Sequence, residues 1–261
     1  MSNALCDFQT EMETLTGLLK VFMIQLSKVF GSRIPMRFSG IHPVKAMVFD
    51  FDGTLAVLTI DFGLMKGRVL EWMKTFGIGE ERFQERYLLE IIEEVYHLLA
   101  KEQNPSEAER FYHGSHRILK EVEIEAAEGG RLIPGSKEML GWLRHKGMKV
   151  GIVTRNCEDA VRRVFPEIDA YCDVFVSRDG VKKVKPHPDH LTAVLRALQV
   201  SGPETVMVGD HVLDILAGKK VGMKTVGVLT GYIKKEEFER AEADFVMRDV
   251  SGISRLLEDN M

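Results

Sequence analysis

The 261-residue sequence has few cysteines, and none is placed as in a disulfide framework. Cys6, Cys157 and Cys172 have no paired spacing and form no CxxC cluster, and an odd number of this kind is typical of reduced thiols. We therefore expect neither disulfides nor a zinc–thiolate site. Reduced thiols also favour a cytoplasmic location.

The sequence also lacks an excess of positive charge. Lys and Arg total 35 against 39 Asp and Glu, a formal net charge of −4. Binding to a nucleic-acid backbone depends on positive charge, so we expect no nucleic-acid partner. With 45% hydrophobic and 28% charged residues, the chain can form a sizeable core and is not of the disordered type.

No apolar run is long enough to span a membrane. The most apolar stretch, residues 15–30, is interrupted by Lys20, Gln25 and Lys28, whereas a spanning helix needs about 20 apolar residues. Acidic residues precede this stretch, which disfavours a secretory signal. Neither a membrane span nor export is expected.

The same stretch has the periodicity of an amphipathic helix, with its apolar residues on one side of the helical wheel. Glycines and prolines punctuate residues 31–44, so we expect residues 1–44 to form a helix and a linker. Such a helix would pack on its own chain, form a homodimer contact, or dock on a membrane or another partner. Alternatively, Met36 is the natural start and the helix has no role.

From residue 45 onward, short apolar strands alternate with helices. Strands are expected at 46–49, 150–153, 174–176, 206–208, 225–228 and 245–247, and helices at 160–165, 191–198 and 215–220. This pattern predicts an α/β fold with a parallel sheet and helices on both faces. Ligands of such sheets bind beyond the carboxyl ends of the strands.

Residues 62–130 have a different character. They are rich in Leu, Glu, Arg and Lys, and apolar residues recur at helical spacing over 69–76 and 87–99. We expect an all-helical domain inserted into an α/β domain made of residues 45–61 and 131–261. Nine Lys and Arg against 14 Glu give this insert a net charge of −5, so it is the acidic part of the chain.

The first expected strand of the α/β domain ends in a segment suited to phosphoryl transfer, Asp50-Phe51-Asp52-Gly53-Thr54. Asp50 can act as a nucleophile, and Asp52 can protonate a leaving oxygen and later take a proton from water. Gly53 permits the sharp turn that lets backbone amides face a ligand. A pair of aspartates in a loop is by itself also ordinary turn chemistry.

Two other strand ends carry oxygen-bearing side chains. Thr154, followed by Arg155 and Asn156, precedes a helix, where a hydroxyl beside free amide groups suits a phosphate, although helix capping explains it equally well. Asp210 and Asp214 lie one helical turn apart and offer the oxygen ligands that Mg²⁺ prefers, although Asp210 alone would also serve as a helix cap.

Lys185 precedes Pro186 in a rigid turn and can direct an ammonium group at a phosphate. Lys182 and Lys183 are close competitors for that role, and a cluster of lysines is usually solvated surface.

Taken together, these four elements resemble the motifs of the haloacid dehalogenase superfamily, and within it the phosphoglycolate phosphatase-like hydrolases. The resemblance extends over about residues 45–257 and leaves the N-terminal 44 residues unexplained. It implies a Rossmann-like core with a helical cap inserted after the first motif. The matching positions are Asp50-Phe51-Asp52-Gly53-Thr54-Leu55, Thr154, Lys185-Pro186, and Gly209-Asp210 with Asp214.

The resemblance also implies the reaction, which is Mg²⁺-dependent hydrolysis of a small phosphomonoester, such as phosphoglycolate or a sugar phosphate, through an aspartyl-phosphate intermediate. Asp50 would be the nucleophile and Asp52 the acid/base. The phosphate would be held by Thr154 and Lys185, with Gly53, Arg155 and Asn156 beside them. The implied magnesium ligands are Asp50, the Asp52 carbonyl and Asp210, with Asp214 in support.

Several alternatives remain open. Asp52 disfavours dehalogenation, because hydrolytic dehalogenases of the superfamily do not keep this residue. A sugar-phosphate mutase shares all four motifs, and an interaction module based on the N-terminal helix is a further alternative. His211, where relatives commonly have a small residue, would narrow the entrance or contact the leaving group. Substrate contacts from the insert, at Arg68, His116 or Arg117, compete with a simpler interpretation as solvated helix residues.

Overall fold

The computed structural model describes residues 36–37 and 43–258, apart from 80, 82, 84–86 and 103. The helix expected at 15–30 and Cys6 lie outside the described residues. Within the segment expected as a linker, β1 (Met36–Arg37) and β2 (Pro43–Val44) pair as a short antiparallel ladder.

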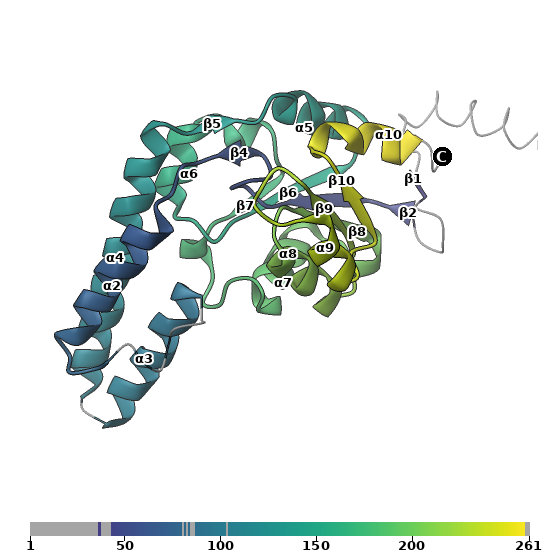
Figure 1. Cartoon of the computed structure of the whole chain (residues 1–261). Helices are drawn as coiled ribbons and strands as arrows, with labels where there is room; N and C mark the ends of the chain where they lie inside the picture. The colour runs from purple at the N-terminus through teal and green to yellow at the C-terminus, as the bar shows by residue number, and fades with distance from the viewer. Residues whose placement is uncertain are drawn as a thin grey trace, which may run out of the picture.

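A six-stranded parallel sheet lies at the centre of the larger part of the molecule (Figure 1). The strand order is β10-β9-β8-β3-β6-β7, so β3, which comes first in the chain, is a central strand. The chain then adds β6 and β7 on one side of β3, and afterwards β8, β9 and β10 on the other side. The predicted Rossmann-like α/β fold is confirmed. The strands are β3 (Ala46–Phe49), β6 (Lys149–Val153), β7 (Val174–Val176), β8 (Thr205–Gly209), β9 (Lys224–Val228) and β10 (Phe245–Met247).

Helices cover both faces of this sheet, because successive side chains of each strand point to opposite faces and both sets are apolar. Met47 and Phe49 of β3 pack in one core cluster with side chains of α5, α6 and α10, and Ala46 and Val48 pack in another with those of α7 and α8. The helices are α5 (Ser136–His145), α6 (Glu158–Val164), α7 (Pro188–Leu198), α8 (Val212–Lys220), α9 (Lys235–Arg240) and α10 (Ile253–Glu258). Short 3₁₀ turns are η1 (Ile168–Ala170), η2 (Arg178–Gly180), η3 (Gly202–Glu204) and η4 (Val250–Gly252).

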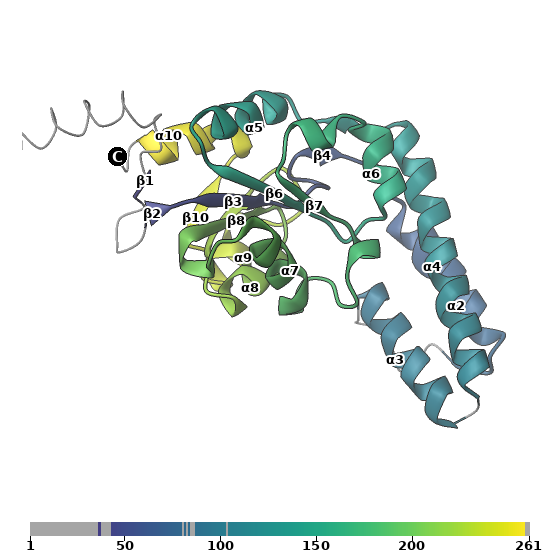
Figure 2. The same ribbon diagram turned by 180° about the vertical axis from the view of Figure 1, so that it is seen from behind.

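Three helices form a lobe to one side of the sheet, α2 (Phe62–Lys74), α3 (Leu88–Glu102) and α4 (Pro105–Glu128) (Figures 1 and 2). We call them the helical lobe. The lobe has its own apolar core, which includes Val69 and Met73 of α2 and Ile92 and Val95 of α3. The chain enters and leaves the lobe through an antiparallel pair, β4 (Ala56–Val57) and β5 (Arg131–Leu132).

The ends of α2 and α4 follow local sequence signals. Asp61 caps α2 by accepting a hydrogen bond from the Leu64 N–H at 2.8 Å. Asn104 caps α4 in the same way, and Pro105 follows as its first helical residue. Tyr87, expected on the apolar face of the second helix, instead precedes α3 and is 49% exposed. It contacts Arg155 and His211 of the α/β core.

Helix α4 also packs on α6 of the α/β core, through a small cluster of Ala127, Cys157 and Ala160. Cys157 is therefore a packing residue, and Cys157 and Cys172 are free and buried. In the part of the chain that the structure describes, no helix is long and apolar enough to cross a membrane.

Candidate active site

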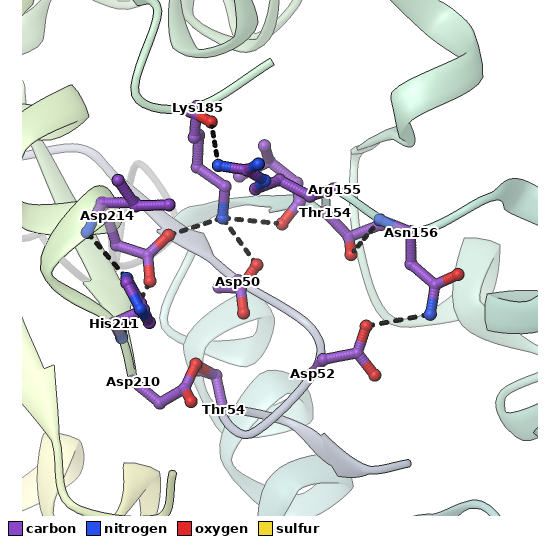
Figure 3. A network of polar contacts seen from close by, with 12 residues as sticks. Asp50, Asp52, Thr54, Thr154, Arg155, Asn156, Lys185, Asp210, His211 and Asp214 are labelled. Carbon is purple, nitrogen blue, oxygen red and sulfur yellow. Dashed lines mark hydrogen bonds and ion pairs between the residues drawn. The ribbon is translucent and has the colours of Figure 1, made fainter. Parts of the chain in front are cut away.

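The parallel register brings three strand ends to one edge of the sheet. In β3, Phe49 lies opposite Ile152 of β6 and Val208 of β8, so the residues that follow these strands meet at the same edge. Asp50 continues the ladder, because its N–H donates to the Val208 carbonyl at 2.9 Å. Figure 3 shows the polar residues gathered there.

A buried lysine joins two of the carboxylates. Lys185 Nζ lies 2.5 Å from Asp50 Oδ1 and 2.6 Å from Asp214 Oδ1, and its side chain is 1% exposed (Figure 3). Lys182 and Lys183, the competing candidates, are exposed. The other oxygen of Asp214, Oδ2, accepts a hydrogen bond from the His211 N–H at 3.1 Å.

Three carboxylates form a cluster suited to a cation. Oxygens of Asp50, Asp210 and Asp214 lie within 4.8 Å of one another. A Cβ at Gly53 or Gly231 would lie 2.2 or 2.0 Å from Asp210 Oδ2, so only glycine leaves room for this carboxylate, and Gly53 also has a positive φ of 75°. An oxygen-only donor set of this kind fits Mg²⁺.

Charge repulsion is concentrated in this cluster. Burial, together with the neighbouring charges of Asp50 and Asp214, raises the pKa of Asp210 to about 9. Burial also raises the pKa of Asp50, to about 6, although the Lys185 ammonium opposes the rise. Burial works against the charge of Lys185 too, but attraction to Asp214 and Asp50 outweighs it and raises the lysine pKa. With only Lys185 to offset them, the ionised forms of these carboxylates are disfavoured, and a bound cation would stabilise them.

Asp52 lies apart from the carboxylate cluster. Its Oδ2 accepts a hydrogen bond from Asn156 Nδ2 at 2.9 Å (Figure 3). Burial and the charge of Asp50 raise the pKa of Asp52 to about 7, against the effect of that hydrogen bond. A carboxyl group of this pKa can both donate and accept a proton near neutral pH. Asn156, expected beside the phosphate, directs its amide at Asp52.

The segment after β6 carries the remaining expected residues. Thr154 is buried, and its Oγ1 accepts a hydrogen bond from the Asn156 N–H at 3.1 Å. Arg155 turns towards the lobe, donating to the Lys185 carbonyl at 2.8 Å and to Glu90 Oε2 of α3 at 3.2 Å. Its guanidinium carbon also lies 5.5 Å from the centre of the Tyr87 ring.

His211 begins α8 as its cap, and its Nδ1 accepts a hydrogen bond from the Leu213 N–H at 3.1 Å. The Tyr87 ring lies edge-on to it, with ring centres 5.8 Å apart. Of the candidates in the helical lobe, Arg68 and Arg117 are exposed and His116 is half-buried. Tyr87, Glu90 and Glu123 of the lobe instead contact the core beside the site. Sequence reasoning missed these contacts because a helical pattern does not show which turn faces another domain.

Residues 47–228 match the family model described as haloacid dehalogenase-like hydrolase. This match extends over more than half of the chain, and the chain belongs to this family. The resemblance inferred from the motifs is thereby confirmed at the level of the superfamily, and the protein is an enzyme of a hydrolase family.

Two curated relatives differ in how much of the chain they match. A haloacid dehalogenase-like hydrolase domain-containing protein of Arabidopsis thaliana is 29% identical over 224 residues, which span 83% of this chain and 85% of that protein. The pyrophosphatase PpaX of Anoxybacillus flavithermus is 36% identical over 117 residues, 44% of this chain and 54% of that protein. The match thus spans about half the length of the pyrophosphatase.

Solved structures share the fold. A hydrolase from Pseudomonas syringae aligns with a TM-score of 0.58 and 22% identity over 82% of this chain and 98% of its own. CbbY from Rhodobacter sphaeroides, in complex with phosphate, aligns with a TM-score of 0.56 and 23% identity over 82% of this chain and 99% of its own.

Proposed function

We propose that this protein is a Mg²⁺-dependent phosphatase that hydrolyses a small phosphomonoester through an aspartyl-phosphate on Asp50. The observation that carries the proposal is the buried Asp50 carboxylate, bound by the Lys185 ammonium at 2.5 Å and followed two residues later by an acid/base candidate of suitable pKa. A nucleophile, a cation to neutralise phosphate charge and a proton donor are the groups that phosphoryl transfer requires.

Asp50, Asp210, Asp214 and the Asp52 carbonyl would hold the magnesium ion. Their oxygens suit it by type, and the three carboxylates already lie together. When bound, Mg²⁺ offsets the negative charge of the phosphoryl group and of the carboxylates. The chain's own residues carry out the transfer of the phosphoryl group and of the protons.

In the first step, an Asp50 oxygen attacks phosphorus while the bond from phosphorus to the ester oxygen breaks. Asp52 gives its proton to that leaving oxygen. Lys185 pairs with the negative oxygens of the phosphoryl group. Thr154 Oγ1 accepts from the Asn156 N–H, and its own hydrogen can be donated to a phosphate oxygen.

In the second step, the Asp52 carboxylate takes a proton from water, and the water oxygen attacks the phosphorus of the aspartyl-phosphate. The bond between Asp50 and phosphorus breaks, inorganic phosphate leaves, and Asp50 returns to a carboxylate. Asp52 then holds the proton that it needs for the next turnover.

In this proposal the helical lobe, with domain limits at residues 62–130, acts as the cap over a core of residues 45–61 and 131–261. Support comes from Tyr87 and Glu90, which place the start of α3 against Arg155 and His211 beside the site. A cap in this position selects the leaving group and limits water. The substrate we propose is a small phosphate ester of the phosphoglycolate or sugar-phosphate type, and the free thiols of Cys157 and Cys172 favour a cytoplasmic location.

The test is phosphate release from phosphoglycolate, sugar phosphates, nucleotides, pyrophosphate and an aryl phosphate, with Mg²⁺ or with a chelator. We expect release that needs Mg²⁺ and that is lost in Asp50→Asn. The matched control is Asp61→Asn, since Asp61 is exposed, lies outside the site and caps α2 through an oxygen that asparagine keeps. No release from any compound by folded, Mg²⁺-loaded protein would refute the phosphatase, and conversion between isomeric sugar phosphates would identify a mutase.

A further inference from the structure

An ion pair outside the four motifs joins the helical lobe to the α/β core. Arg178 of η2 donates to both carboxylate oxygens of Glu123 on α4, with Nη2 to Oε2 at 2.8 Å. Each of the two side chains is 5% exposed. Desolvation offsets much of the attraction within a buried ion pair, so the pair is weak evidence for stability, and its further hydrogen bonds bear on what it does.

The pair holds the backbone that follows β6. Arg178 Nη1 also donates to the Arg155 carbonyl at 2.9 Å, and the Arg178 N–H donates to the Asn156 carbonyl at 3.1 Å. From the lobe side, Glu123 Oε2 accepts a hydrogen bond from the Cys157 N–H at 3.2 Å. The side chains of the pair thus hold residues 155 and 157, and the backbone N–H of Arg178 holds residue 156.

The segment held in this way orients Asp52. The same Cys157 N–H is shared with Asn156 Oδ1, at 2.7 Å, so Glu123 and the Asn156 side chain meet at one donor. This contact leaves the Nδ2 end of the amide to face Asp52 Oδ2, 2.9 Å away (Figure 3). The other oxygen, Asp52 Oδ1, is buried and has no hydrogen-bond partner among the described residues. In the proposed mechanism, this unpartnered oxygen is the one that exchanges a proton with the leaving group.

We infer that Glu123 is a positioning residue for the acid/base step, an inference that rests on the proposed phosphatase function. Through Arg178 and the Cys157 N–H it fixes Asn156, and through Asn156 it aims the Asp52 carboxyl group at the leaving oxygen. Glu123 lies in the helical lobe and Asn156 in the core. The orientation of the Asp52 carboxyl group therefore depends on the position of the helical lobe relative to the core.

The test compares Glu123→Gln with Glu125→Gln, an exposed glutamate on the same helix. Two substrates are used, an alkyl phosphomonoester and p-nitrophenyl phosphate. The alkoxide is a poor leaving group that needs the proton of Asp52, whereas nitrophenolate leaves without it. Because kcat/KM reports only the steps up to departure of the leaving group, it isolates this proton transfer.

For Glu123→Gln we expect kcat/KM to fall by about 10- to 100-fold on the alkyl ester and by less than about threefold on p-nitrophenyl phosphate. Glu125→Gln should match the wild type on both. Equal losses on the two substrates, or no loss on either, would overturn the inference while leaving the phosphatase in place. Absence of phosphate release by the wild type would overturn the proposed function and the inference together.

Glu123→Gln leaves the Arg178 charge buried without its partner, which can prevent folding. The double variant Glu123→Gln/Arg178→Gln removes both charges and serves the same comparison. We expect from it the same selective loss of kcat/KM on the alkyl ester. If the ratio of kcat/KM for the two substrates stayed at the wild-type value, the inference would be overturned.

Discussion

Arg155, directly after Thr154 in the core, forms an ion pair with Glu90 in the first turn of α3, with 3.2 Å between Nη2 and Oε2. The two side chains are 22% and 38% exposed. Beside them, the Tyr87 ring contacts both the Arg155 guanidinium and the His211 ring. The start of α3 is therefore attached to the core at the edge of the carboxylate site.

Breaking this attachment should affect substrate binding more than stability. We expect Glu90→Gln to raise KM by up to about fivefold, because the helical lobe is held less firmly against the core. The free energy of unfolding should change by less than about 1 kcal/mol, because the pair is partly solvated. Steady-state kinetics and urea unfolding measure the two effects. The control, Glu107→Gln, breaks the exposed Glu107–Arg110 pair within α4, and a KM change of the same size there would contradict the prediction.

Lys185 should be needed for both folding and activity. Lys185→Met leaves Asp50 and Asp214 buried without their cation, and we expect a loss of roughly 3–5 kcal/mol in the free energy of unfolding. Phosphate release should fall by at least about 100-fold. Urea unfolding in the presence of a chelator and a phosphate assay test this. Lys183→Met, which alters an exposed neighbour, should behave as wild type.

Magnesium should stabilise the fold independently of turnover. At about 100 times its dissociation constant, a ligand of the native state adds about 2.7 kcal/mol, visible as a higher Tm than with chelator. We expect Asp210→Asn to lose most of this shift, because it removes a ligand of the cluster, and Asp61→Asn to keep it. An equal shift in both variants would show that Mg²⁺ binds elsewhere.

His190 should make the protein less stable in acid. It is buried on α7, with its Nδ1 near the Lys185 N–H and its Nε2 near the Val176 carbonyl. Burial and the nearby Lys185 charge lower its pKa from 6.5 to about 3. The unfolded chain therefore binds the proton more readily, so this contribution to stability is complete above pH 6.5 and is lost as the pH falls towards 3.

The measurement for His190 is the free energy of unfolding at pH 6 and pH 5. Wild type should lose about 1 kcal/mol more over this interval than His190→Gln, which has no imidazole to protonate. An identical loss in the two proteins would mean that His190 does not titrate as described.

The sheet could be predicted from the sequence because each of its strands is a short apolar run next to a turn. All six expected strands occur in the structure at or within two residues of their expected positions. Tyr87 shows where such reasoning ends. Its spacing fits the apolar series of α3, but it lies before the helix and contacts the core. The sequence could not predict this contact, because spacing along one helix carries no information about a second domain.

Residue types and strand ends, read from the sequence alone, determined that Asp50, Thr154 and Asp210 would meet at one edge of the sheet, because parallel strands place their carboxyl ends together. The family resemblance singled out Lys185 over Lys182 and Lys183, but only the tertiary structure showed that Lys185 is buried between Asp50 and Asp214. The tertiary structure alone brought Glu123 to Arg178, 55 residues apart in the chain. Such contacts depend on how helices and loops pack across domains, and a local sequence pattern does not encode that packing.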